Sequence, residues 1–179
     1  QGLPVNIISI DELTSIEAEL YMSLIVDRAD KCVSMIVSRA GGMNIEEVAE
    51  TNPEKILKIK FQDGHKIDKD QLNDVCRKLE FNSDQSTQFH EIVKGCKKLF
   101  LEKDLSLLEI NPLVITSEGD LHCLDAKINV DENALYRQED IRSMRDSSQE
   151  DEREYQAKQH DLSYVSLDGN IGCMVNGAG

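Results

Sequence analysis

The sequence predicts an α+β fold in which a mostly antiparallel sheet is packed with helices. Three observations support this prediction. Two β-prone runs in the second half of the chain are joined by a short turn that contains glycine, which is typical of a hairpin. Two more apolar runs near the N-terminus flank a turn-forming stretch. Between these pairs, apolar side chains recur at helical spacing.

The first elements along the chain are predicted to be strands. Residues 5–8 form a short β-like run. Residues 19–26 and 31–38 carry apolar and β-branched side chains and are separated by a polar turn, so they predict a strand pair. Because their apolar stretches are continuous, we expect both faces of these strands to be covered, as in a sheet packed against helices.

A pair of glycines at 41–42 ends the second of these strands. Asn44 is a suitable N-cap for a short helix over about 45–50. A diglycine before a helix can hold a phosphate group. However, Glu46 and Glu47 occupy the first turn, where they stabilise the helix dipole and repel an anion. We therefore interpret the diglycine as structural.

The middle of the chain predicts one more strand and two helices. Residues 55–61 are β-prone and are followed by a polar loop over 62–66. Apolar residues then recur at helical spacing over 72–79 and again within 84–102, which predicts amphipathic helices whose apolar stripes face the core.

The hairpin formed by 106–115 and 121–127 carries the candidate site. Residues two apart on a strand share a face, so Glu109 and Asn111 point the same way. A turn between the strands brings Asp125 within about one position of facing Asn111. Oxygen ligands of this kind suit Mg²⁺, which keeps several waters and binds substrate phosphates. The alternative is a hairpin whose polar residues simply face water.

Composition excludes several classes of protein. The 179 residues are 40% hydrophobic, enough for a sizeable core. A formal net charge of −14 argues against a nucleic-acid partner and against binding to an anionic membrane. The five cysteines are scattered without a C-x-x-C pair, which favours reduced thiols over a zinc site or a disulfide framework.

Two motifs in the hairpin make the sequence recognisable. Glu-Ile-Asn-Pro-Leu-Val at 109–114, followed by Cys-Leu-Asp-Ala-Lys at 123–127, resembles the metal-binding hairpin of the ATP-grasp domain in the β subunit of succinate–CoA ligase. The resemblance extends over nearly the whole chain. Further matching blocks are 133–138, 144–146, 149–151 and 167–179.

The resemblance implies a division of the chain into three parts. Residues 1–146 would be a partial ATP-grasp domain and 147–162 a helical connector. Residues 163–179 would be the truncated start of a flavodoxin-like CoA-ligase domain, with 164–167 and 173–175 as its first strands. On this interpretation the chain is a fragment of a longer protein, and the fragment alone is expected to be inactive.

The resemblance also implies a reaction. The family enzyme, which belongs to the citric acid cycle, converts succinyl-CoA, a nucleoside diphosphate and phosphate into succinate, CoA and a nucleoside triphosphate. The reaction passes through acyl phosphate and phosphohistidine intermediates. Asn111 and Asp125 match the ligands of Mg²⁺. Glu109 matches the catalytic glutamate that approaches the phosphohistidine of the partner α subunit. The nucleotide is expected to be ATP/ADP or GTP/GDP.

Four more residues match binding positions of the family. Asp11 lies where the family usually has Glu beside the adenine, and Thr14 follows three residues later. Glu19 matches the acidic residue that accepts from a ribose hydroxyl, and Asn176 matches a contact to the dicarboxylate substrate, succinate. No histidine of the chain lies in a family active-site motif, so we expect all four to be structural or surface residues.

Two other functions remain compatible with the sequence. One is a related ATP-grasp acyl-CoA ligase, such as malate–CoA ligase, with the same hairpin and a different acid specificity. The other is a non-catalytic, acidic interaction module whose hairpin carries no metal. Mg²⁺-dependent nucleotide binding would separate an enzyme from such a module. The resemblance predicts a location in the bacterial cytoplasm, or in the mitochondrial matrix of a eukaryote.

Overall fold

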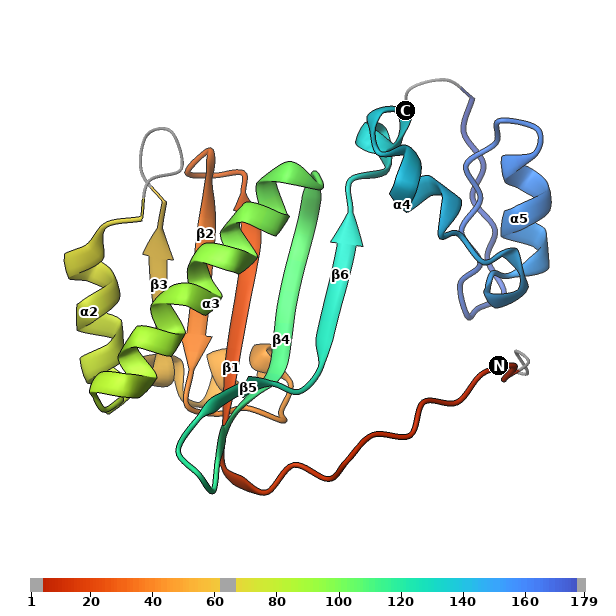
Figure 1. The fold of residues 1–179 in the computed structure, drawn as a ribbon. Helices are drawn as coiled ribbons and strands as arrows, with labels where there is room; N and C mark the ends of the chain where they lie inside the picture. The colour runs from red at the N-terminus through yellow and green to blue at the C-terminus, as the bar shows by residue number, and fades with distance from the viewer. Residues whose placement is uncertain (1–4, 62–66, 177–179) are drawn as a thin grey trace. The chain divides into compact units, whose positions relative to one another are not determined.

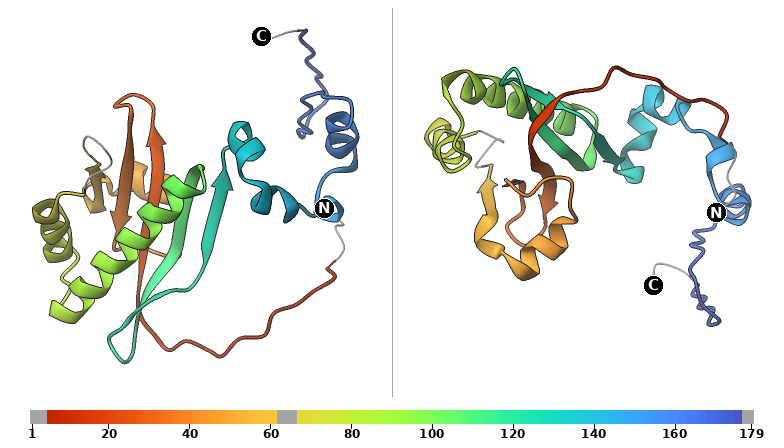
Figure 2. Two further views of the ribbon diagram at one scale, coloured as in Figure 1. Left: turned by 45° about the horizontal axis from the view of Figure 1, so that its top comes forward. Right: turned by 90° about the horizontal axis from the view of Figure 1, so that it is seen from below.

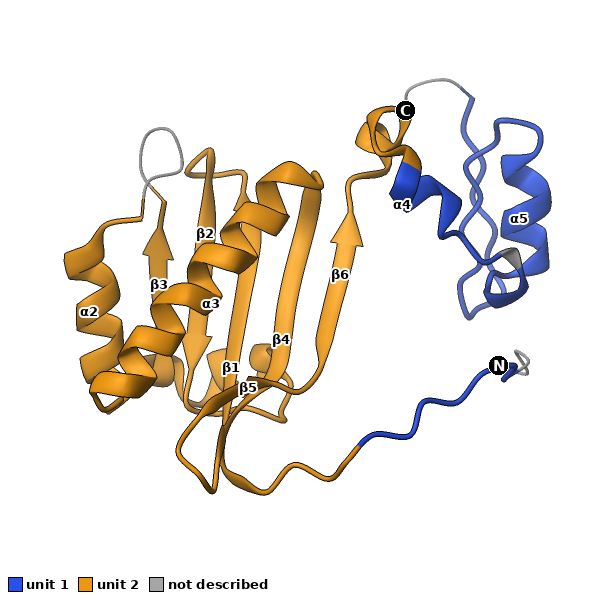
Figure 3. Ribbon diagram, viewed as in Figure 1, with its two compact units in different colours: residues 1–11, 140–179 blue, residues 12–139 orange. Residues whose placement is uncertain are grey.

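The computed structural model of the chain describes residues 5–61 and 67–176, so the predicted loop 62–66 lies outside the described residues. The chain forms two compact units (Figure 3). Residues 12–139 make the larger unit, and residues 1–11 and 140–179 make the smaller one. Within the described ranges, no helix combines the length and apolar character needed to cross a bilayer.

A six-stranded antiparallel sheet forms the centre of the larger unit (Figure 1). Its strand order is β3-β2-β1-β4-β5, and β6 pairs with β4 as well. The sheet packed with helices confirms the predicted fold class. The strands are β1 (Ile16–Asp27), β2 (Cys32–Ser38), β3 (Ile56–Lys60), β4 (Leu105–Thr116), β5 (Leu121–Cys123) and β6 (Ala126–Val130).

The three α-helices that lie wholly within the described part of this unit begin at polar N-caps, as their sequences predict. Asn44 accepts a hydrogen bond from the backbone N–H of Glu46 and so caps the first helix. Asn82 and Gln85 form a reciprocal capping box at the longest helix. These helices are α1 (Ile45–Thr51), α2 (Lys69–Lys78) and α3 (Ser83–Glu102).

The core lies between the sheet and the helices α2 and α3. Alternate residues of β1, Leu20, Met22 and Leu24, are buried there against α3. Phe89 and Val93 of α3 are fully buried in the same cluster. The helix α1, in orange, lies on the opposite side of the sheet from α3 (Figure 2, right). The second face of the sheet is therefore the one on which polar side chains can gather.

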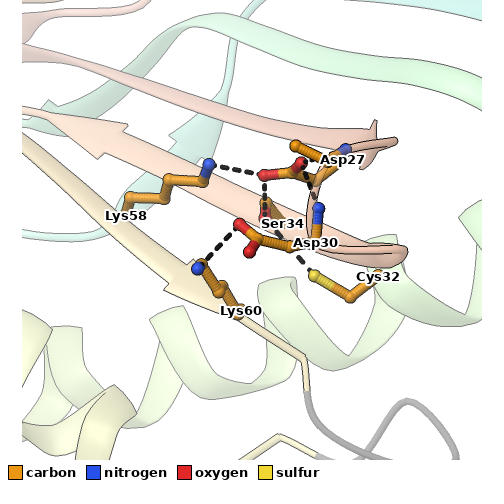
Figure 4. A network of polar contacts seen from close by, with 7 residues as sticks. Asp27, Asp30, Cys32, Ser34, Lys58 and Lys60 are labelled. Carbon is orange, nitrogen blue, oxygen red and sulfur yellow. Dashed lines mark hydrogen bonds and ion pairs between the residues drawn. The ribbon is translucent and has the colours of Figure 1, made fainter.

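A polar network fastens the edge strand β3 to the β1–β2 turn (Figure 4). Lys58 Nζ donates to Asp27 at 2.5 Å, and Lys60 pairs with Asp30 at 2.7 Å. The hydrogen bond from Lys58 and those from backbone N–H groups hold the pKa of Asp27 well below its usual range. Charged lysines on an outer strand also discourage pairing with another chain.

The turn between α3 and β4 is held by residues from one of the family-matching blocks. The 3₁₀ helix η3 (Glu132–Arg137) follows β6. Arg137 pairs with Asp104, and Gln138 donates to the same carboxylate at 2.7 Å. Gln138 also donates to the backbone oxygen of Glu102 at 2.9 Å. The block 133–138 thus stabilises the entry to β4 by polar contacts.

The smaller unit contains a charged helix. Within the predicted helical connector 147–162 lies the helix α5 (Glu152–Lys158), which Asp151 caps by accepting from the N–H groups of Arg153 and Glu154. Before it lie the short helices α4 (Glu139–Ser143), which begins in the larger unit, and η4 (Ser147–Gln149).

Three predicted strands are not formed in the described residues. Residues 5–8 are irregular and exposed, with Ile7 at 89%. Residues 164–167 and 173–175 are irregular as well, and Met174 is 98% exposed. In each case β propensity is not matched by a neighbouring strand in the described chain, and a strand needs such a partner to satisfy its backbone groups. The assignment of 163–179 to a second domain stays a prediction.

Candidate functional site

The site is built on a β-bulge in β4. On β1, Leu20 and Met22 are two residues apart, but their partners on β4, Leu113 and Ile110, are three apart. All four side chains belong to the core or face it. The extra length falls on Asn111 and Pro112, which are joined by a cis peptide bond. A bulge of this kind redirects side chains without ending the strand.

The outer edge of β4 is interrupted at the same place. β5 pairs with residues 113–115 and β6 with the part of β4 before Asn111. Between β5 and β6, the Leu124 N–H donates to Pro112 O at 3.2 Å, and the Asn111 N–H donates to Asp125 O at 3.1 Å. The backbone of Asn111 on β4 therefore lies beside that of Asp125, in the connection between β5 and β6, which agrees with the predicted register.

The side chain of Asn111 is held at both ends by the loop that precedes α1. Its Oδ1 accepts from the Gly42 N–H at 2.8 Å. Its Nδ2 donates to the backbone oxygen of Met43 at 3.0 Å. Sequence reasoning missed this contact, because it joins residues 69 positions apart. The diglycine was a visible signal, but nothing local indicated its partner.

Glu19 lies beside the same diglycine loop that holds Asn111. The Gly41 N–H donates to Glu19 O at 3.2 Å. A Cβ added to Gly42 would lie only 2.1 Å from Oε2 of Glu19, so this carboxylate rests against the glycine. The structure thus brings together three predicted site residues, Glu19, Asn111 and Asp125.

Glu109 shares the sheet face of Tyr21 and Ser23. Ser23 is its direct partner on β1, and Tyr21 lies two residues earlier on the same strand. Burial raises the pKa of the Tyr21 phenol, and the nearby carboxylates of Glu109 and Glu46 raise it further. Tyr21 therefore stays neutral at physiological pH. The fully buried Ser23 hydroxyl lies beside the Tyr21 phenol and, by hydrogen bonding to it, partly offsets this rise in pKa.

Lys127 lies directly opposite Glu109 on the other neighbouring strand, β6. A lysine and a glutamate at opposed positions in an antiparallel pair attract one another. The face around Glu109 consequently combines carboxylates, a phenol and one amine. Such a face can orient an incoming cationic or hydrogen-bonding group.

The donor set suits a hard, oxygen-preferring divalent cation held largely by other ligands. A carboxamide oxygen has two lone pairs, and Gly42 uses one of those on Asn111. The Asp125 side chain is exposed. Among the described residues, no group of three or more His, Cys, Asp or Glu side chains could hold a metal alone. One carboxylate and one carboxamide fit Mg²⁺ whose remaining positions belong to water and phosphate.

The other predicted residues are not gathered at this place by the structure. Thr14 lies in irregular backbone ahead of β1, in the same unit. Asp11, which accepts from Ser9 Oγ at 2.8 Å, and the exposed Asn176 belong to the smaller unit. Their predicted roles rest on the sequence.

The histidines and one surface hollow contribute no site. His122 and His160 are exposed, and the Nε2 of His90 is buried without a partner among the described residues. His65 lies outside those residues. A hollow of about 390 Å³ along α5 is lined by residues such as Arg153 and Gln156, and contains no predicted site residue.

One family model and several curated proteins match the chain. Residues 1–115 match the family model described as the ATP-grasp domain. The whole chain aligns at 50% identity over 184 residues with succinate–CoA ligase (ADP-forming) subunit beta of Coxiella burnetii, of which it covers 46%. The corresponding subunit of Saccharophagus degradans is 52% identical over 178 residues, covering 99% of this chain and 46% of that protein. The chain thus spans about half the length of the curated relatives it matches.

A solved structure supports the fold independently. ATP citrate lyase from Methanothrix soehngenii, in complex with citrate and coenzyme A, superposes with a TM-score of 0.63 over 84% of this chain and 34% of that one. Sequence identity in this pair is 17%, so the likeness concerns the fold alone.

Proposed function

The chain belongs to the ATP-grasp family, and from this premise we propose that it is the nucleotide- and Mg²⁺-binding part of a succinate–CoA ligase β subunit. The full enzyme would convert succinyl-CoA, nucleoside diphosphate and phosphate into succinate, CoA and nucleoside triphosphate. Identity near 50% along the whole chain to β subunits of that enzyme supports this proposal. Because those relatives are named as ADP-forming, we propose ADP and ATP as the nucleotides.

One observation carries the proposal: the bulge in β4 places Asn111 directly beside Asp125 where the outer edge of the sheet breaks. Asn111 would supply a carboxamide oxygen and Asp125 a carboxylate to Mg²⁺. An ion held by these two residues would supply positive charge against the phosphates of the nucleotide. An acidic chain with a net charge of −14 needs such a cation to bind a polyphosphate.

Glu109 would act on the partner rather than on the metal. It lies on the face of Tyr21, two residues before Asn111, and opposite Lys127. We propose that its carboxylate orients the histidine of an α subunit and stabilises the cationic form of the imidazole. Burial and then the nearby carboxylate of Glu109 raise the pKa of Tyr21, which therefore stays neutral beside this glutamate.

The remaining contacts concern the nucleotide and the acid substrate. Glu19 would accept from a ribose hydroxyl, while Asp11 and Thr14 would lie near the purine. Asn176 would contact succinate. In this family, the nucleophilic histidine belongs to the partner subunit, so no histidine of this chain is assigned a catalytic role.

The test is Mg²⁺-dependent ADP binding by the full-length protein, measured by calorimetry. Wild type should bind ADP at least tenfold more tightly with Mg²⁺ than with EDTA, because both the protein and the phosphates would supply ligands to the ion. Asp125→Ala should lose most of this difference while its circular dichroism spectrum stays unchanged. Equal ADP affinity with and without Mg²⁺ in the wild type would instead favour a non-catalytic interaction module. Activity with malate in place of succinate would favour the related ligase.

A further inference from the structure

The two glycines at 41–42 have no role in the function proposed above, yet both of their N–H groups are engaged. The Gly41 N–H donates to Glu19 O at 3.2 Å, and the Gly42 N–H donates to Asn111 Oδ1 at 2.8 Å. A phosphate cradle requires free N–H groups that point at the ligand. This loop therefore does not act as an anion site, and its target is a side chain of the protein itself.

The loop recognises one of the two orientations of the Asn111 carboxamide. It offers a donor, the Gly42 N–H, to Oδ1 and an acceptor, the Met43 carbonyl, to Nδ2 at 3.0 Å. Rotating the amide by 180° would set two carbonyl oxygens against each other and two N–H groups against each other. Both hydrogen bonds would then become repulsive contacts, so the orientation is fixed.

Only glycine permits the loop to approach this closely. A Cβ on Gly41 would lie 2.4 Å from the backbone nitrogen of Leu20, and no side-chain rotation could relieve that clash. Gly42 has φ +65° and already contacts the carboxylate of Glu19. The diglycine is thus explained by contact with β1 and with Asn111, on neighbouring strands.

We propose that the loop 41–43 is a positioning element that holds the Asn111 carboxamide with its oxygen available to the divalent cation. This inference rests on the proposed function, in which Asn111 is a ligand. Mg²⁺ binds the oxygen and never the NH₂ group of a carboxamide. Oδ1 keeps one lone pair after accepting from Gly42, and Nδ2 is turned away towards Met43. Groups that orient a metal ligand in this way typically change metal affinity by 10- to 100-fold when they are removed.

The experiment measures Mn²⁺ binding to the full-length protein in the presence of ADP, by electron paramagnetic resonance. Gly41→Ala displaces the loop and should weaken Mn²⁺ binding by about tenfold. Gly42→Ala meets the flexible end of Glu19 and also strains a backbone with φ +65°, so it should weaken Mn²⁺ binding in the same direction. It also keeps the test valid where Gly41→Ala fails to fold. If Gly41→Ala and Gly42→Ala each fold and each bind Mn²⁺ as tightly as wild type, the inference is overturned.

Two further variants separate orientation from general damage. Gly119→Ala is the matched control, because Gly119 also has a positive φ (+91°) but an added Cβ would meet no atom within 4 Å. It should change Mn²⁺ affinity less than twofold. In an Asn111→Asp background an oxygen faces the Met43 carbonyl in either orientation, so the loop no longer selects one orientation and Gly41→Ala should cost little. An equal loss in both backgrounds would overturn the positioning role.

Failure of the proposed function gives a different result. If Asn111→Ala and Asp125→Ala both bind Mn²⁺ with ADP as tightly as wild type, the metal site itself is misassigned. If these two variants lose binding and the glycine variants do not, only the role of the loop is refuted.

Discussion

Substituting Gly41 by alanine is expected to destabilise the end of the sheet that carries the site. The added Cβ would lie 2.4 Å from Leu20 N and 2.5 Å from its carbonyl carbon and oxygen, whereas ordinary contacts begin at 3.4 Å. Because these atoms belong to the backbone of a central strand, it is the loop that must move, by about 1 Å.

The cost follows from what that movement breaks. The hydrogen bond from the Gly41 N–H to Glu19 O, already 3.2 Å long, would be lost, at about 1 kcal/mol. Residual crowding against the strand adds about 2 kcal/mol. We therefore expect a local loss of about 3 kcal/mol in the free energy of opening.

Hydrogen exchange followed by mass spectrometry is the appropriate assay, because it reports the free energy of opening for each segment of the full-length protein. Peptides covering β1 and residues 39–51 should exchange about 100-fold faster in Gly41→Ala, as a loss of about 3 kcal/mol requires. Gly95→Ala is the matched control: Gly95 is exposed within α3, and an added Cβ meets no atom within 4 Å. That variant should be more stable by about 0.5–1 kcal/mol. Equal exchange rates in wild type and Gly41→Ala would refute the reasoning.

Three further predictions concern charge and protonation. Glu109→Gln keeps the size but loses the charge, so transfer between the partner's histidine and nucleotide should slow by about 10- to 100-fold in rapid-quench experiments; a large loss of Mg²⁺–ADP affinity would instead make Glu109 a metal ligand. Hydrogen bonds from Arg137 and then Gln138 lower the pKa of Asp104 in the folded state, so its stabilisation is present above the unfolded pKa and lost as pH falls through the folded one. Urea unfolding of Asp104→Asn should accordingly depend less on pH between about 5 and 2 than that of wild type, and identical pH profiles would contradict this. Burial, together with the charge of Cys123, raises the pKa of Cys96 to about 11, so its alkylation rate should still be rising at about pH 10; a plateau near pH 9 would be inconsistent with that environment.

Much of the fold follows from local sequence signals. Strands β1 and β2, the capped helix after Asn44 and the amphipathic helix α3 were predicted because their apolar periods and caps are encoded within a few residues. The β4–β5 turn around Gly119 fixed the hairpin register, which is why Asn111 could be placed beside Asp125.

The features that escaped prediction depend on distant partners. The bulge at Asn111–Pro112 is defined only by the pairing of β4 with β1, far earlier in the chain. The contact between Gly42 and Asn111 spans 69 positions. The wrong strand at 5–8 reflects the converse problem, since β propensity alone forms no strand where the described chain offers no partner.

Of the predicted site residues, the structure brings Glu19, Asn111 and Asp125 together and sets Glu109 on the adjoining face. Their chemical roles stay predictions. The backbone register determines which side chains are neighbours. Which ion or molecule these side chains bind depends on their charge and on the lone pairs that remain free.

The central claim is that Asn111 and Asp125 together hold the divalent cation of a bound nucleotide. Crystals of the full-length protein grown with ADP and Mn²⁺, with data collected at the manganese absorption edge, test it most directly. We expect one anomalous peak within coordination distance, about 2.2 Å, of both Asn111 Oδ1 and an Asp125 carboxylate oxygen, with the Gly42 N–H still donating to Oδ1. A fully occupied Mn²⁺–ADP complex in which the peak contacts neither side chain would contradict it.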